Sequence, residues 1–266
     1  MSKLTTAGRL FYTLAITLIG IQFIIYTDFN SPIMPLPIGL GARNLWMRLL
    51  GTVMLVCGLG MGIEKKGEWA AIVLALLFFT LFLIVHLPKI IAQPKDGGAW
   101  TGAFEWIALA AGALIHGRSM HSQSGHQPGP GLLARLVSAG AFIFGISLFI
   151  FGLQHFIYAD FIAQLVPSWA PLHLFWAYAV GVLFFLFGIS IVFRRNAYVG
   201  ALCLALMFLT WLLFLHAPRV VAEPHNDDEW TSGFIAMAMC GIGFMLAGSF
   251  IKPVPQGMTR TADSTF

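Results

Sequence analysis

Long stretches of the chain contain almost no charged residues, and their lengths match the thickness of a bilayer. Eight such stretches occur, at residues 8–27, 45–63, 69–88, 100–116, 134–157, 174–193, 197–217 and 230–250. A transmembrane helix needs about 20 predominantly apolar residues, because the hydrocarbon core of a bilayer is about 30 Å thick. Barrel strands would be shorter and would alternate polar with apolar residues, whereas Leu74 to Val85 is apolar except for Thr80. The pattern therefore predicts an all-α membrane protein with eight transmembrane helices.

Composition and net charge support the same setting. Hydrophobic residues make up 58% of the 266 residues and charged residues only 10%. Such a composition excludes a soluble globular domain and a disordered chain. The formal net charge of +4 is small, so the chain offers no strongly basic surface for nucleic acid. The partner that the composition predicts is the lipid bilayer.

The placement of the basic residues predicts the orientation of the spans. Ten lie in segments on one side, at Lys3, Arg9, Lys65, Lys66, Arg118, Arg135, Arg194, Arg195, Lys252 and Arg260. Five lie on the other side, at Arg43, Arg48, Lys89, Lys95 and Arg219. Because cytoplasmic segments are enriched in Lys and Arg, the first side is predicted to be cytoplasmic. With eight spans, both termini are predicted to lie there.

An internal duplication is the strongest signal in the chain, because residues 7–116 align with residues 134–246 at an offset of 130 to 132. The segment from His86 to Pro94 reappears from His216 to Pro224. Four spans in each copy place both copies in the same orientation, so the duplication predicts two parallel four-helix-bundle repeats. The predicted organisation is a first repeat at 1–116, a cytoplasmic linker at 117–132, a second repeat at 133–251 and a cytoplasmic tail at 252–266.

Most repeated polar residues lie at the predicted outer ends of the spans, where they form a candidate polar site. One set ends the first and fifth spans: Gln22, Tyr26, Asp28, Gln154, Tyr158 and Asp160. The other set is a repeated His-x-Pro-Lys/Arg motif: His86, Lys89, His216 and Arg219. Proline two residues after the histidine is expected to end the helix. The motif is then either a simple helix stop or the lining of an anionic or quinone-type head-group site.

The copies also differ, and the differences suggest where a single site would lie. His155 replaces Phe23 within the fifth span, and an ionisable group inside the membrane is a functional candidate by default. Arg48 and Glu105 lie within spans of the first copy, and the second copy has no charged residue at the equivalent positions. An unpaired charge is costly at this depth, so we expect these two side chains to face the bundle interior and to pair or share a polar cavity.

Metal and nucleotide chemistry find little support in the sequence. The three cysteines, Cys57, Cys203 and Cys240, lie within spans and form no Cys-x-x-Cys pair, so they are expected to be packing residues. His155 and His216 could approach each other between the fifth and seventh spans, but the sequence disfavours haem and predicts no dedicated metal. No P-loop, Gly-x-Ser-x-Gly, His-Glu-x-x-His or dinucleotide motif is present.

The run from Gly152 to Phe161, followed by Leu165 to Pro171 and Phe175 to Tyr178, resembles the DoxX-like family of bacterial four-helix membrane proteins. The first half resembles the family more faintly, and Phe23 departs from the motif where the second half has His155. The resemblance implies a four-helix-bundle unit in the bacterial inner (plasma) membrane. Relatives include subunits associated with thiosulfate:quinone oxidoreduction and with thiol-oxidative stress complexes. It therefore implies quinone as a candidate cofactor and a membrane or periplasmic oxidoreductase as a candidate partner.

Three functions stay open on the sequence. The first is a redox-associated membrane subunit that contacts quinone or an oxidoreductase partner at the periplasmic boundary, with His155 and His216 as head-group partners. The second is a non-enzymatic membrane scaffold. The third is a small-solute or lipid permease with a site between the repeats, where Arg48 and Glu105 would be the polar groups. Whether the protein is an enzyme also stays open.

Overall fold

The computed structural model describes residues 2–27, 34, 41–63, 66–123 and 132–251, without the side chains of residues 121–123 and 132–138. All regular secondary structure in this part of the chain is helical. Eight of its helical segments are long and apolar enough to cross a membrane. The prediction of an all-α membrane protein with eight transmembrane helices is confirmed.

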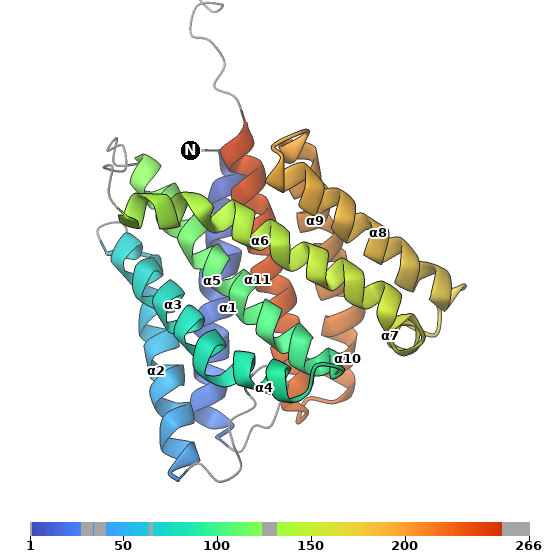
Figure 1. The fold of residues 1–266 in the computed structure, drawn as a ribbon. Helices are drawn as coiled ribbons and strands as arrows, with labels where there is room; N and C mark the ends of the chain where they lie inside the picture. The colour runs from blue at the N-terminus through green and yellow to red at the C-terminus, as the bar shows by residue number, and fades with distance from the viewer. Residues whose placement is uncertain (1, 28–33, 35–40, 64–65, 124–131, 252–266) are drawn as a thin grey trace, which may run out of the picture.

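The helices follow the order of the predicted spans (Figure 1). In the first half, residues 2–123, they are α1 (Lys3–Ile25), α2 (Arg43–Met61), α3 (Gly67–Leu81), η1 (Phe82–His86), α4 (Leu87–Ala92) and α5 (Gly97–Gln123). In the second half, residues 132–251, they are α6 (Leu132–Ile157), α7 (Ala159–Leu165), α8 (His173–Val192), α9 (Ala197–Trp211), η2 (Leu212–His216), α10 (Ala217–Ala222) and α11 (Asp227–Phe250). Two details were not predicted: α5 continues through the first part of the expected linker, and the short helix α7 follows α6.

The prolines of the repeated motif do not end their helices, so that expectation is wrong. Each is preceded by a five-residue π-helical turn, η1 or η2, and the chain remains helical from Gly67 to Ala92 and from Ala197 to Ala222. Pro88 stands at the start of α4 and Pro218 at the start of α10. Proline is tolerated at a helix start because its missing N–H is not needed there. The wider π turn thus accommodates a proline that would break a regular α-helix.

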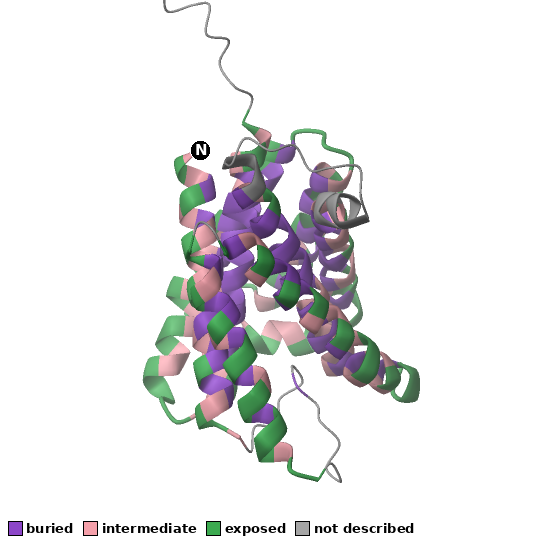
Figure 2. Ribbon diagram, turned by 90° about the vertical axis from the view of Figure 1, so that its left-hand side faces the viewer, coloured by how far each residue is buried: buried purple, intermediate pink, exposed green. Residues whose placement is uncertain are grey.

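The two halves are interlocked. α1 packs along α2 in its own half and along α11 of the second half, while α6 packs along α8 and along α5 of the first half. α5 and α11 also touch each other and are the most deeply buried spans, whereas the outer helices keep one face exposed (Figure 2). The core of the molecule is therefore built by both halves together.

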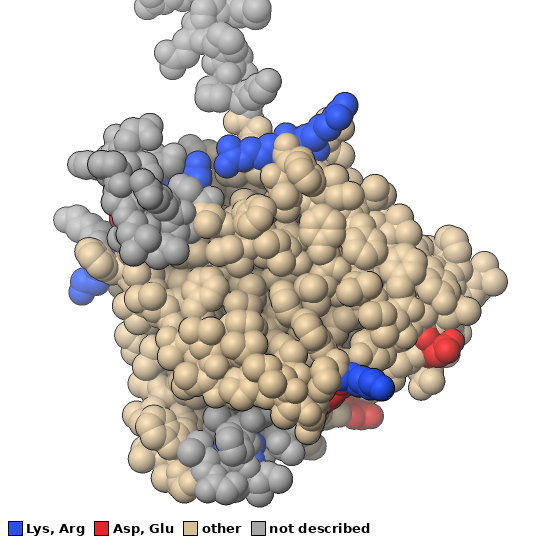
Figure 3. Space-filling model, in the orientation of Figure 1, with Lys and Arg blue, Asp and Glu red and all other residues tan. Residues whose placement is uncertain are grey.

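The two ends of the bundle differ in charge. We call the end where α1 begins and α11 ends the terminal end, and the opposite end the far end. A Cβ atom added at Gly248 would lie within 2.4 Å of the Ser2 hydroxyl oxygen, so the start of α1 adjoins the end of α11. On the face shown in Figure 3, basic side chains gather at the terminal end, and the middle of that face is uncharged. An uncharged belt between charged ends is what a bilayer-spanning protein requires.

Glycines allow the closest helix approaches. A Cβ atom at Gly51 of α2 would lie 2.6 Å from the carbonyl oxygen of Gly20 in α1. One at Gly241 of α11 would lie 2.7 Å from the carbonyl oxygen of Gly8. Small residues at such contacts let helices pack closely where lipid gives no hydrophobic driving force. α1 is therefore held tightly on two sides by backbone contact.

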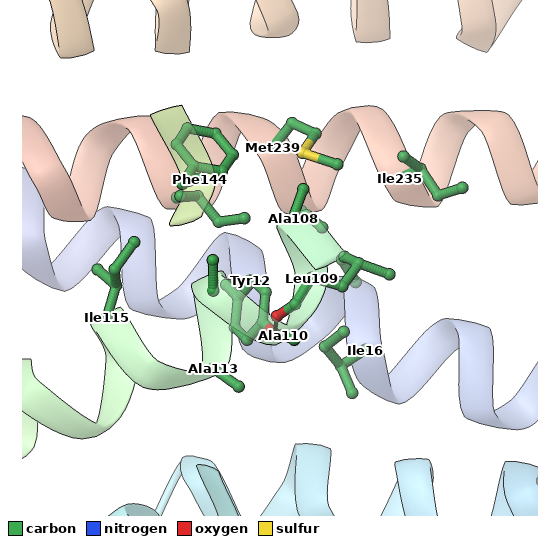
Figure 4. Packing of buried hydrophobic residues seen from close by; sticks show 14 of the residues in the cluster. Tyr12, Ile16, Ala108, Leu109, Ala110, Ala113, Ile115, Phe144, Ile235 and Met239 are labelled. Carbon is green, nitrogen blue, oxygen red and sulfur yellow. Dashed lines mark hydrogen bonds between the residues drawn. The ribbon is translucent and has the colours of Figure 1, made fainter. Parts of the chain in front are cut away.

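Apolar side chains fill the centre between α1, α5 and α11 (Figure 4). Tyr12 and Ile16 of α1 lie beside Leu109 of α5, with Ile235 and Met239 contributed by α11. The Tyr12 hydroxyl, fully buried, donates a hydrogen bond to the Leu109 carbonyl oxygen. The cysteines lie in spans as expected, with Cys57 and Cys240 buried and Cys203 exposed on α9.

Candidate functional site

Two buried glutamines join the halves at the far end. The Gln22 Nε2 group donates to the Thr231 hydroxyl and to the Asp227 carbonyl oxygen, both at 2.7 Å. The Gln154 Nε2 group donates to the Thr101 hydroxyl at 3.0 Å and to the Gly97 carbonyl oxygen at 2.9 Å.

In each case the first long helix of one half is tied to the first turn of the last long helix of the other half. We call these interactions the glutamine clamps. Sequence reasoning placed both glutamines in a polar site but did not find their threonine partners. The signal was present, because Thr101 and Thr231 recur at the same offset of 130 as the His-x-Pro motif.

Other candidate residues stabilise the loops at the far end. The Tyr158 hydroxyl donates to the Lys95 carbonyl oxygen at 3.0 Å. An Arg219 guanidinium N–H donates to the Leu165 carbonyl oxygen at 2.8 Å. Tyr158 and Arg219 therefore hold backbone segments of the far end in place, rather than being left free for a ligand.

Two further described candidates, Lys89 and Asp160, take no defined part in a site. Lys89 is half-buried in α4, and Asp160 is exposed in the first turn of α7. Asp28 lies outside the described residues.

The two motif histidines have different surroundings. His86 is fully buried, and its ring centroid lies 5.8 Å from that of Trp106, which in turn packs 4.8 Å from Phe78. His216, at the same position of η2, is half-buried and faces Gly233 of α11, where an added Cβ would lie 3.7 Å from the His216 Cβ.

In the second half, Ala236 stands where the first half has Trp106. Within the described part of the chain, the buried Nδ1 atom of His216 has no hydrogen-bond partner. The absence of a tryptophan above it leaves His216 the less enclosed of the two histidines.

His155 belongs to an aromatic cluster of the second half. Its ring meets Phe184 edge-on at 5.2 Å, and Phe184 lies 6.0 Å from Phe208 and 5.9 Å from Trp211. The cluster comprises Phe151, His155, Phe184, Phe208 and Trp211, from α6, α8 and α9. The corresponding positions of the first half are mostly aliphatic and closely packed: Ile19, Phe23, Met54, Phe78 and Leu81.

The tautomer of His155 follows from its hydrogen bond. Nδ1 lies 2.8 Å from the carbonyl oxygen of Phe151 on the same helix, so Nδ1 bears the proton and donates it. In the neutral ring Nε2 is then an acceptor. Because the His155 side chain is only half-buried, this nitrogen can accept a hydrogen bond or a proton from a ligand.

The aromatic cluster extends toward His216. Trp211 is the residue before η2, and a π-helical turn bonds each residue to the fifth along the chain. His216 therefore lies one turn beyond Trp211, nearer the far end. No group of three or more His, Cys, Asp or Glu side chains able to hold a metal occurs among the described residues.

The expected pairing of Arg48 with Glu105 is wrong. Arg48 is exposed on α2, which packs against α1 and α3, whereas Glu105 is half-buried on the central helix α5. Across the part of the chain that the structure describes, neither side chain forms an ion pair or a hydrogen bond. Arg48 lies only five residues from the start of α2, so its long side chain can reach the membrane interface without a partner.

The chain matches no protein-family model, no curated protein and no solved structure. Its class therefore rests on its own helices. They define an integral, multi-pass, all-helical membrane protein in contact with the lipid bilayer.

Proposed function

We propose that this protein is a DoxX-like, redox-associated subunit of the bacterial inner membrane that binds a quinone-type head group at the far end of its second half. The observation that supports this most directly is the environment of His155 and His216. Both are half-buried, and the aromatic cluster reaches from one toward the other. The equivalent first-half residues, Phe23 and His86, are fully buried.

The chemistry of these side chains suits a quinone. Aromatic rings pack favourably against a planar apolar ring system. The Nδ1 atom of His216 needs a hydrogen-bond partner that a ligand carbonyl could supply. The Nε2 atom of His155 can accept a hydrogen bond from a quinol hydroxyl. The proposed roles are therefore binding and orientation, together with a place for a proton at His155 Nε2.

We also propose that the terminal end faces the cytoplasm and the far end the periplasm. The described basic residues of the terminal end are Lys3, Arg9, Lys66, Arg118, Arg194 and Arg195. The far end holds five described basic residues, Arg43, Arg48, Lys89, Lys95 and Arg219, and most of the described acidic ones, Asp96, Asp160, Glu223, Asp227, Asp228 and Glu229. Over the full sequence the terminal side carries ten Lys and Arg residues against five on the far side, and enrichment of Lys and Arg on the cytoplasmic side supports this orientation.

Two parallel repeats are the arrangement that best accounts for the architecture. The π-helical turns η1 and η2 lie at an offset of 130 residues. The glutamine clamps connect equivalent helices in both directions. Both features support a duplicated four-helix unit whose copies are related by an axis along the membrane normal.

The proposal is tested on protein purified gently from its native membranes. An organic extract is compared by mass spectrometry with the bulk lipid of those membranes. We expect quinone enrichment in the wild type and its loss in His155→Phe, which copies Phe23. The matched control is His225→Phe, the same change at an exposed loop residue. If the wild type shows no enrichment, the quinone proposal fails.

A non-enzymatic scaffold is the second candidate, and a specific observation favours it. Gln22, Gln154, Tyr158 and Arg219 all take part in hydrogen bonds that hold helices or loops together. These residues need no ligand to explain them. The permease hypothesis loses its main argument, because Arg48 and Glu105 do not form a shared polar centre.

A further inference from the structure

Glu105 is a carboxyl group within a membrane-spanning helix. It lies eight residues after Gly97, the first residue of α5, which places it about 12 Å along the helix from the far end. Its side chain is half-buried. An ionisable residue at such depth is rare because the charged form is costly there, and it usually marks a pathway for ions or protons.

No counter-charge for Glu105 is found in the part of the chain that the structure describes. Among the described residues, its carboxyl group forms neither an ion pair nor a hydrogen bond. The described titratable groups on the elements packed against α5 are Lys3, Arg9 and Tyr12 of α1, Glu68 of α3, His86 of η1, Lys89 of α4, His155 of α6, and Asp227, Asp228, Glu229 and Cys240 of α11; α5 itself adds His116 and Arg118. The carboxyl group must therefore be neutralised by something other than these side chains.

At the position of the second half that is equivalent to Glu105, Ile235 is a buried core residue. Ile235 on α11 is 7% exposed and belongs to the apolar core. Thr231, one turn earlier, is 2% exposed, whereas Thr101, one turn before Glu105, is half-buried. The α5 face with Thr101 and Glu105 is thus more accessible than its counterpart on α11.

The glutamine clamp defines where this accessible face lies. Thr101 bonds to Gln154 of α6, and residues four apart on a helix share a face. Glu105 is therefore one turn deeper than the clamp, on the face of α5 that turns toward α6. The clamp therefore lies between Glu105 and the far end.

We propose that Glu105 is an intramembrane proton-binding site between α5 and α6, which takes up and releases a proton from the far end. A proton is the one counter-charge that neutralises a lone carboxylate without another side chain. The side chain is not sealed in the apolar core, and the membrane setting makes the neutral acid the less costly form. This site is independent of the proposed quinone site.

A lipid-soluble carbodiimide tests the proposal on the full chain reconstituted in vesicles. The reagent adds to a protonated carboxylic acid within the membrane and leaves a stable acylurea adduct, which mass spectrometry locates on the peptide. We expect wild-type Glu105 to be modified. The rate should fall about tenfold per pH unit once the carboxyl group ionises, in a series from about pH 5 to pH 9.

Two variants and one reference residue make the result specific. Glu105→Gln should show no adduct at this position, and Glu105→Ile copies the second half as a second control on folding. Glu229, at the start of α11, should be modified by a water-soluble carbodiimide instead. The proposal is overturned if Glu105 is modified only after unfolding, or if its modification does not change with pH. Protection by Na⁺ at constant pH would also overturn it, because it would indicate a metal-cation site.

Discussion

At the far end of the first half His86 lies fully buried beside Trp106, whereas at the far end of the second half His216 is half-buried and Ala236 replaces the tryptophan. The backbone is alike in both places, with a π-helical turn followed by a proline. Because the backbone is alike, the shape of the helices does not explain why only His216 is accessible. The difference lies in the neighbouring long helix, where Trp106 covers His86 and Ala236 leaves His216 partly open.

The largest effect is expected from removing that side chain. Trp106→Ala should lower the free energy of unfolding by about 3–5 kcal/mol, because it deletes a fully buried ring that packs against Phe78 and His86. Thermal unfolding in detergent measures the change. The control is Trp169→Ala, where the side chain is 72% exposed and the change should stay within about 0.5 kcal/mol. Equal losses in both variants would contradict the role given to Trp106.

A smaller and symmetrical effect is expected at the glutamine clamps. Gln22→Leu and Gln154→Leu each remove two hydrogen bonds between the halves, and each should cost about 1–2 kcal/mol. Unfolding of the two single variants under identical conditions gives the comparison. Markedly unequal costs would show that the two clamps are not equivalent.

The two halves also differ in the core, where the first half has Tyr12 and the second half has Phe144. Tyr12→Phe copies Phe144, its counterpart in the second half, and removes the hydrogen bond to the Leu109 carbonyl oxygen. We expect a loss of about 1 kcal/mol, measured by denaturant titration. No loss at all would show that the hydrogen bond contributes nothing to stability.

The smallest effect is expected at Arg48. Arg48→Tyr copies Tyr178, which is exposed at the equivalent position of α8. Because Arg48 is exposed and makes no side-chain bond among the described residues, unfolding should change by less than about 0.5 kcal/mol. A loss of several kcal/mol would restore the idea of a buried ion pair.

The spans could be predicted because their signal is local. Charge-free runs of sufficient length define a bilayer-crossing helix regardless of what it packs against. The π-helical turns were missed because Pro88 and Pro218 are read locally as helix stops, and only the surrounding helix shows that they are accommodated.

The details of the site depend on contacts between distant parts of the chain. The Gln22 to Thr231 bond joins residues 209 positions apart, which no local pattern reveals. Arg48 was placed inside the bundle because the sequence does not show which face of α2 meets its neighbours. His155 was found because an ionisable residue stands out in an apolar span.

The interlocked packing has a consequence for how the protein is made. α1 is synthesised before the other described helices, yet its most extensive contact is with α11, the last of the described helices in the chain. Until α11 has been made, the glycine-lined face of α1 that receives it must remain covered by lipid or by a chaperone. The packing of α1 is therefore completed only after α11 has emerged, and a product shortened before α11 would leave α1 without its principal neighbour.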